Sequence, residues 1–419
     1  MGVPESPERQ SGGDGVPPRE ADSRQRLLEI LRVFAKIGAM SYGGAAIMGI
    51  MQAEIQQRRG WMSKERYLEG LAFVNMLPGA PATQLSIFIG HDRAGWRGGL
   101  LAGTCFVLPA FAVMLGLTLL YTAYGALPVM RDAFYGLGPV VLGIFVVAVI
   151  RLARAALTGR PQLAIAVAAA LLAAATPVGT AEILLLAGCA GVTLYHARGP
   201  GLRAALAVAL LIGAWHGAGA ILVPPATAPS PVAGHGAPGL WDIGSFFFHA
   251  GAFTFGGGIT VLAFVQDQVV NQLHWLTPRE FLDGLALGQL TPGPVLMLAA
   301  YVGYKLCGIP GAAVGAFSIF LPSFILVLSV LPVLNRFRQI AWIKAAMRAI
   351  SAAVIGVLAV SIAHLTPHAA PDAFTMVLMV ITIAVMVAFS LAPLKMIVAG
   401  SLVGIASRLK PIQRLKDLA

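Results

Sequence analysis

The chain has 419 residues, of which 58% are hydrophobic and 11% are charged, and its formal net charge is +11. Soluble domains carry about 25% charged residues, so this composition excludes an ordinary water-exposed globule and predicts an all-α polytopic protein in a lipid bilayer. The basic residues lie between apolar runs and are not interleaved with aromatic ones, so we expect no nucleic-acid partner. The three cysteines form no CxxC or Cys/His cluster, and we predict no metal site and no cofactor.

The chain contains one unusual segment twice. Gly38-Ala-Met-Ser-Tyr-Gly-Gly44 matches Gly251-Ala-Phe-Thr-Phe-Gly-Gly257 position by position. The same offset along the chain, with a slip of one residue in the middle, relates Met76-Leu-Pro-Gly79 to Leu290-Thr-Pro-Gly293. Two hydrophobic halves that are broken by Gly-Gly and Pro-Gly at matching places indicate the binding site of a secondary transporter.

In chain order, residues 1–26 lack an apolar stretch and are predicted to be a disordered tail. Segments 27–50 and 70–96 are expected to enter the membrane and return on the cytoplasmic side. Spans are expected near residues 100–122, 128–150, 161–176, 181–196 and 203–223. The loop 224–240 has no Lys or Arg, so the positive-inside rule places it outside.

Because one extra span separates the repeats, the second repeat is expected to have inverted topology. The predicted organisation is a tail, a first repeat, a linking span with its outer loop, a second repeat and a basic C-terminal tail: 1–26, 27–200, 201–240, 241–408 and 409–419. That C-terminal tail would lie outside in this nine-span arrangement, which its positive charge disfavours. The inverted repeat is therefore a firmer expectation than the number of spans.

The broken helices predict an anion site near the membrane midplane. Irregular backbone at that depth must be buried in protein or line a wet cavity, and half-helix N-termini present N–H groups and a positive dipole end there. The alternative is that the glycines and prolines only allow tight packing or turns. The candidate substrate-binding residues at the breaks are Ser41, Gly43, Gly44, Pro78, Gly79, Gln84, Thr254, Gly256, Gly257, Pro292 and Gly293.

Ionisable groups near the breaks are further candidates. Lys36 and its repeat partner His249 could bind the anion substrate or carry a proton; the alternatives are snorkelling of Lys36 to the interface and a local hydrogen bond for His249. Glu54 and Asp267, which the repeat offset pairs, are candidates for proton coupling or gating, with a solvated ion pair to Arg58 or Arg59 as the alternative for Glu54. The neutral side chains Asn75 and Gln289, just before the Pro-Gly breaks, join this coupling or gating group.

These motifs resemble the chromate ion transporter family in its long, two-domain form. The resemblance is carried by Phe34-Ala-Lys-Ile-Gly-Ala-Met-Ser-Tyr-Gly-Gly44, Leu77-Pro-Gly79 and Phe106-Val-Leu-Pro109, and by Thr291-Pro-Gly-Pro294 and Phe320-Leu-Pro322 in the second half. It implies export of chromate across the cytoplasmic (inner) membrane, coupled to protons, with sulfate as a competing tetrahedral oxyanion. It implies no enzymatic activity.

Two other functions fit the same sequence. One is a transporter of the same fold that moves sulfate or another oxyanion. The other is a passive anion channel, since broken helices can also line a pore. A homodimer is left open.

Overall fold

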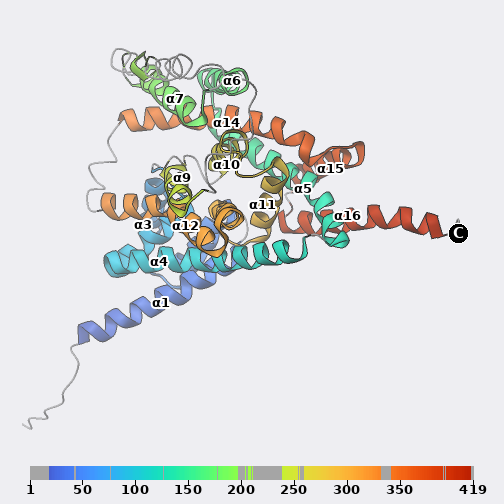
Figure 1. The fold of residues 1–419 in the computed structure, drawn as a ribbon. Helices are drawn as coiled ribbons and strands as arrows, with labels where there is room; N and C mark the ends of the chain where they lie inside the picture. The colour runs from blue at the N-terminus through green and yellow to red at the C-terminus, as the bar shows by residue number, and fades with distance from the viewer. Residues whose placement is uncertain are drawn as a thin grey trace, which may run out of the picture.

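The computed structural model describes residues 18–41, 44–75, 77–125, 127–176, 178–196, 238–252, 254, 259–331, 341–389, 391, 393–416 and a few residues between 203 and 210. Across these residues the chain is helical and has no strand (Figure 1). The first half contains α1 (Pro18–Met40), α2 (Gly44–Gln52), the π-helix η1 (Ala53–Arg58), α3 (Lys64–Val74), α4 (Pro81–Tyr124), α5 (Pro128–Ala156), α6 (Arg160–Ala175) and α7 (Thr180–Tyr195).

The second half repeats this order. It contains α9 (Leu240–Ala252), α10 (Ile259–Gln266), the π-helix η2 (Asp267–Gln272), α11 (Pro278–Leu290), the 3-10 turn η3 (Val295–Met297), α12 (Leu298–Val330), α14 (Ala341–Ala369), α15 (Ala373–Phe389) and α16 (Pro393–Lys416). Even the π-helices recur, although a π-helix is rare and commonly marks a functional site. The expectation of an all-α chain is confirmed.

Within the described ranges, four helices are long and apolar enough to cross a membrane. They lie at Pro81–Tyr124, Asp132–Ala156, Val295–Val330 and Lys344–Ala369. Shorter apolar helices, α6, α7, α15 and the first part of α16, accompany them. This composition and length are those of a multi-pass membrane protein. The predicted linking span near 203–223 and nearly all of the loop 224–240 lie outside the described residues.

The long helices α4 and α12 are each folded back on themselves. In α4 the chain leaves helical geometry at Ala94 and Gly95, where Gly95 has a φ of +63°. The two arms then pack so closely that a Cβ on Gly90 would overlap the carbonyl oxygen of Gly98. The matching turn in α12, at Gly308, has a φ of +61° and the same packing of its arms. A left-handed corner of this kind favours glycine, so each repeat contains a helical hairpin.

The two halves exchange helices. α5 packs against α15 and α16 of the second half, and α14 packs against α6 and α7 of the first, as Figure 1 shows for α14. These contacts join backbone to backbone: a Cβ on Gly136 of α5 would overlap Gly400 of α16, and one on Gly356 of α14 would overlap Ala166 of α6. Small residues permit such approach between membrane helices. The halves are therefore interlocked rather than placed side by side.

Helices extend into both predicted tails. α1 begins at Pro18, so residues 18–26 are helical rather than part of a disordered tail. Proline suits the first position of a helix, and Glu, Ala, Gln and Arg in this stretch favour helix. α16 likewise continues through Lys416 into the predicted C-terminal tail. The rest of the predicted N-terminal tail, residues 1–17, lies outside the described residues.

Candidate functional site at the crossing of the two Pro-Gly turns

The two Pro-Gly turns meet the glycine breaks of the opposite halves. The amide of Gly79 donates to the carbonyl oxygen of Thr254 at 2.6 Å. The amide of Gly293 donates to the carbonyl oxygen of Ser41, also at 2.6 Å. Since Gly79 corresponds to Gly293 and Ser41 to Thr254, the two bonds are reciprocal, as at an isologous interface. Segments that are far apart in the sequence are thus joined twice at one crossing.

The turns require glycine at their centres. Gly79 and Gly293 have φ values of +129° and +99°, and both are buried. An L side chain is strained in this region, and there is also no room for one. A Cβ on Gly79 would lie 2.5 Å from Ser323 Oγ, and a Cβ on Gly293 would lie 2.8 Å from the Cβ of Ala110. Ala110 and Ser323 occupy matching positions in α4 and α12, so the crossing is symmetric in backbone but not in polarity.

The first turn is polar. Ser323 Oγ accepts from the amide of Ala80 at 3.0 Å, and Gln84 Nε2 donates to the carbonyl oxygen of Pro78 at 2.6 Å. Gln84 Oε1, Thr83 Oγ1 and Ser41 Oγ are buried without a hydrogen-bond partner among the described residues. Buried polar atoms in this state need an explanation, and an absent ligand or water is one.

The second turn is less polar. Thr291 Oγ1 donates to the carbonyl oxygen of Leu287 at 2.8 Å and lies 3.3 Å from the sulfur of Met114. Buried Leu296 and Met297 follow Gly293, where the first half has the polar side chains of α4. The unpaired polar groups of the crossing therefore come from the α1 end and from α4, with Ser323 of α12 beside them.

Both helix starts after the turns lack a side-chain cap. α4 begins after Ala80 with Pro81 at its first position, and η3 begins after Pro294. Ala82 and Thr83 in the first turn of α4 are buried. A helix start that is buried without a cap leaves N–H groups for another partner, and its dipole favours an anion. This arrangement can bind a small anion, and the described residues at the crossing present no nucleophile paired with a general base for covalent chemistry.

Comparison with known proteins places the chain in a family. A family described as Chromate transporter matches residues 28–194 and 241–405, which is most of the sequence. The chain belongs to the chromate transporter family. It is 31% identical over 383 residues to the chromate transport protein of Cupriavidus metallidurans, covering 91% of this chain and 93% of that protein. No solved structure matches it significantly.

Further relatives show both the long and the short form. A probable chromate transport protein of Synechococcus elongatus is 31% identical over 343 residues, covering 80% of this chain and 83% of that protein. An uncharacterized transporter of Bacillus subtilis, YwrA, is 31% identical over 166 residues, which is 38% of this chain and 91% of that protein. As a member of the chromate transporter family, the chain is a transporter rather than an enzyme.

The other predicted site residues of this chromate transporter take no part in the hydrogen bonds of the crossing described above. Lys36 and His249 are exposed, and His249 Nδ1 lies 2.6 Å from the carbonyl oxygen of Ser245, the local bond that was the alternative interpretation. Asn75 is exposed and its Nδ2 donates to the carbonyl oxygen of Leu71 at the end of α3. Gln289 is half-buried in the last turn of α11.

The structure does not align Glu54 with Asp267. The π-helix η1 begins at Ala53 and η2 begins at Asp267, so Glu54, the second residue of η1, corresponds to Gln268. The backbone bonds from Trp61 to Ile55 and from Trp275 to Val269 follow the same register. The pairing of Glu54 with Asp267 is therefore off by one position. The reason is that the slip in the repeat comes before the π-helices, between the glycine break and η2.

Glu54 belongs to an ion-pair cluster. Its carboxylate lies 3.1 Å from Arg59 Nε and 3.3 Å from Arg58 Nη1. Burial opposes ionisation of Glu54, but the Arg59 hydrogen bond and the charges of Lys36, Arg59 and Arg58 outweigh it and lower its pKa. Glu54 is therefore a carboxylate at neutral pH, as the ion-pair alternative expected.

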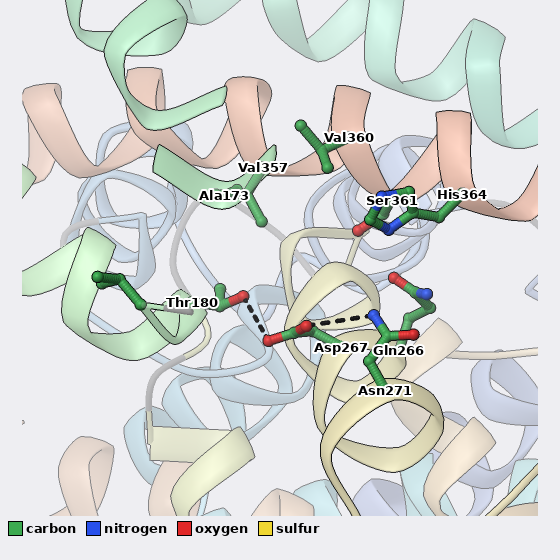
Figure 2. Close-up of a pocket in the computed structure, with 10 residues that line it drawn as sticks. Ala173, Thr180, Gln266, Asp267, Asn271, Val357, Val360, Ser361 and His364 are labelled. Atoms are coloured by element: carbon green, nitrogen blue, oxygen red, sulfur yellow. Dashed lines mark hydrogen bonds between the residues drawn. The ribbon is translucent and has the colours of Figure 1, made fainter. Parts of the chain in front are cut away.

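Asp267 lines a small polar pocket between the halves. Its carboxylate accepts from Thr180 Oγ1 of the first half and from Asn271 Nδ2, both at 3.3 Å. Figure 2 shows Asp267 directed toward these two residues, with His364 on the α14 side. The cavity has a volume of about 30 Å³, room for about one water molecule. The pocket is therefore too small for a tetrahedral oxyanion.

Gly43, Gly256 and Gly257 lie outside the described residues, and Gly44 begins α2. Sequence reasoning missed Thr83 and Ser323. Ser323 directly follows the repeated Leu321-Pro322 motif, where the first half has Ala110 after Pro109. That departure between two otherwise matching motifs was the signal that could have revealed it.

Proposed function

We propose that this protein exports chromate across the cytoplasmic membrane by a proton-coupled mechanism, with the oxyanion bound at the crossing of the two Pro-Gly turns. The observation that carries the proposal is the reciprocal pair of hydrogen bonds from Gly79 to Thr254 and from Gly293 to Ser41. These bonds gather two uncapped helix starts at one buried place. Family membership and the names of the relatives support chromate as the substrate.

The chemistry of the crossing suits a tetrahedral dianion. Ser41 and Thr83 offer hydroxyl donors, the Gln84 amide can redirect its Nε2 from the Pro78 carbonyl, and the helix starts offer N–H groups. A site made of neutral donors and dipoles binds without a fixed opposite charge. An ion can therefore also leave it, which transport requires. Sulfate has the same shape and charge and should compete.

The inverted repeat explains how such a site could open to both sides. We propose that the repeats 27–200 and 241–408 are related by a pseudo-two-fold axis in the membrane plane, and that the glycine breaks and hairpins form re-entrant segments. Glu54 with Arg59, and Asp267 with Thr180, are then contacts that change as the site alternates. The Asp267–Thr180 contact can act as a gate because it joins elements of the two halves, whereas the Glu54–Arg59 pair lies within one segment at the end of η1.

The test is chromate flux in proteoliposomes of the full chain, with and without an imposed pH gradient and with sulfate as competitor. Chromate flux driven by the gradient supports the proposal. Flux that ignores the gradient identifies a channel. Gradient-driven sulfate movement without chromate movement keeps the site and overturns the substrate. Vesicles that contain the Gly79→Ala variant serve as the matched control for background flux.

A further inference from the structure

Asp283 is a half-buried carboxylate that the mechanism above does not use. It lies on α11, about two turns before the Pro292-Gly293 turn that enters the crossing. Its Oδ2 accepts a hydrogen bond of 2.6 Å from the hydroxyl of Tyr121 on α4 of the other half. The same helix α4 contacts the second turn through Met114 and Thr291. Asp283 thus joins the same two elements that meet at the anion site.

The charged neighbours of this position differ between the two repeats. Asp283 corresponds to Glu69, which lies 2.9 Å from Arg66 in an ion pair. Arg66 also binds Asp92, at 2.9 Å. The charges of the Arg66–Asp92 pair are exchanged in the second half. There Glu280 corresponds to Arg66, and it binds Lys305 at 2.8 Å. Because a glutamate stands where the first half has this arginine, Asp283 forms no ion pair within the described residues, unlike its counterpart.

Tyr301 provides a second observation in the same place. Its ring packs against Gly284, next to Asp283, and lies 6.4 Å from the ring of Tyr121. Its hydroxyl is buried without a hydrogen-bond partner in the described part of the chain. The matching residue of the first half is Phe88, which has no hydroxyl. A buried hydroxyl near a carboxyl group can accept a hydrogen bond from that group when it is protonated.

The charged and titratable groups around Asp283 come from three helices. Arg279 and Glu280 lie on α11 itself, Tyr121 on α4, and Lys305 and Tyr301 on α12. Glu280 forms an ion pair with Lys305. Burial is the main influence on Asp283 and raises its pKa to about 6, against the opposing effects of Tyr121 and Arg279. Such a carboxyl changes its protonation near physiological pH.

We propose that Asp283 carries the proton that the transporter exchanges for its anion. The inference rests on the proposed proton-coupled function and names its carrier. As a carboxylate, Asp283 accepts from Tyr121. As a carboxylic acid, formed by taking a proton from water on one side, it donates to Tyr301 or Tyr121 and releases the proton on the other side. Gain or loss of this proton changes the hydrogen bond between Asp283 and Tyr121 that holds α11 to α4. Both helices lead into the anion site.

The experiment compares the full chain with Asp283→Asn and Glu69→Gln in proteoliposomes. Chromate flux is measured against pH and against an imposed gradient, and infrared difference spectra between pH 5 and 8 record the carboxyl C=O band. We expect Asp283→Asn to lose gradient-driven flux and the protonated-carboxyl band. Glu69→Gln, the matched position with an arginine partner, should keep the wild-type pH profile.

Tyr121→Phe keeps Asp283 and gives a second readout if the asparagine variant does not fold. Loss of the Tyr121 donor destabilises the carboxylate, so the midpoint of the pH profile should move to higher pH. Gradient-driven flux in Asp283→Asn, or an unmoved midpoint in Tyr121→Phe, would overturn the inference alone. Wild-type chromate flux that ignores the gradient would overturn the proposed coupling, and the carrier with it.

Discussion

The amide of Gly79 donates a 2.6 Å hydrogen bond to the carbonyl oxygen of Thr254, and so ties the first Pro-Gly turn to the glycine break of the other half. The bond from Gly293 to Ser41 repeats this relation in reverse. Because each turn is bonded to the opposite half, a movement of one half relative to the other must change the hydrogen bonds of both turns. This makes the crossing a suitable place for a site that alternates between two sides of a membrane.

The glycines of the crossing should tolerate no side chain. Gly79→Ala and Gly293→Ala each place an alanine at positive φ, at a cost of about 1–2 kcal/mol, and each adds a contact shorter than 3.0 Å. We expect chromate flux to be lost while membrane insertion persists. Gly116→Ala is the control, since a Cβ there meets nothing within 4 Å among the described residues. Full flux in either variant would remove these turns from the site.

A negative charge at Gln84 should repel the anion. Gln84→Glu keeps the shape of the side chain beside Pro78 but places a carboxylate at the first turn. We expect the apparent KM for chromate to rise at least tenfold, which corresponds to about 1.4 kcal/mol. The control is Gln162→Glu, because Gln162 is also buried with an Oε1 that lacks a partner in the described residues but lies on α6. Equal effects of the two substitutions would mean that the charge acts on folding.

Glu54 should affect the rate but not the pH dependence of transport. Its pKa is lowered, so the ion pair with Arg59 is fully present above the ordinary carboxyl pKa and is lost only as the pH falls through the lower folded value. Glu54→Gln should therefore change kcat and leave the neutral part of the pH profile in place. An exposed pair contributes about 0–1 kcal/mol to stability, so thermal unfolding should change little. If the transport rate of this variant did not depend on pH, Glu54 would be a proton carrier instead.

The contact between Thr180 and Asp267 should act on gating. Thr180→Val removes the hydroxyl that crosses from the first half to Asp267, with little change of shape. One hydrogen bond of this kind contributes about 1 kcal/mol, so we expect kcat to change about fivefold without a change in KM. Thr193→Val is the control, because Thr193 donates within its own helix, to the carbonyl oxygen of Cys189. Stopped-flow exchange of chromate measures both constants.

The sequence alone determined the class, the repeat and the places where helices break. A membrane protein follows from composition, because a bilayer requires long apolar helices. Glycine at Gly79 and Gly293, and proline before each, predicted irregular turns because these residues control the backbone locally. The family followed from the same motifs, and the comparison confirmed it.

The tertiary structure decided which of these local features meet. The exchange of α5 and α14 between the halves, the reciprocal bonds at the crossing, and the contact of Tyr121 with Asp283 all join residues far apart in the chain. No local pattern specifies such pairs, because each depends on how whole helices pack. Asp283 illustrates the reason: its counterpart Glu69 pairs with Arg66, whereas Glu280 stands at the arginine's position and pairs with Lys305, and these pairs exist only once the helices place the partners side by side.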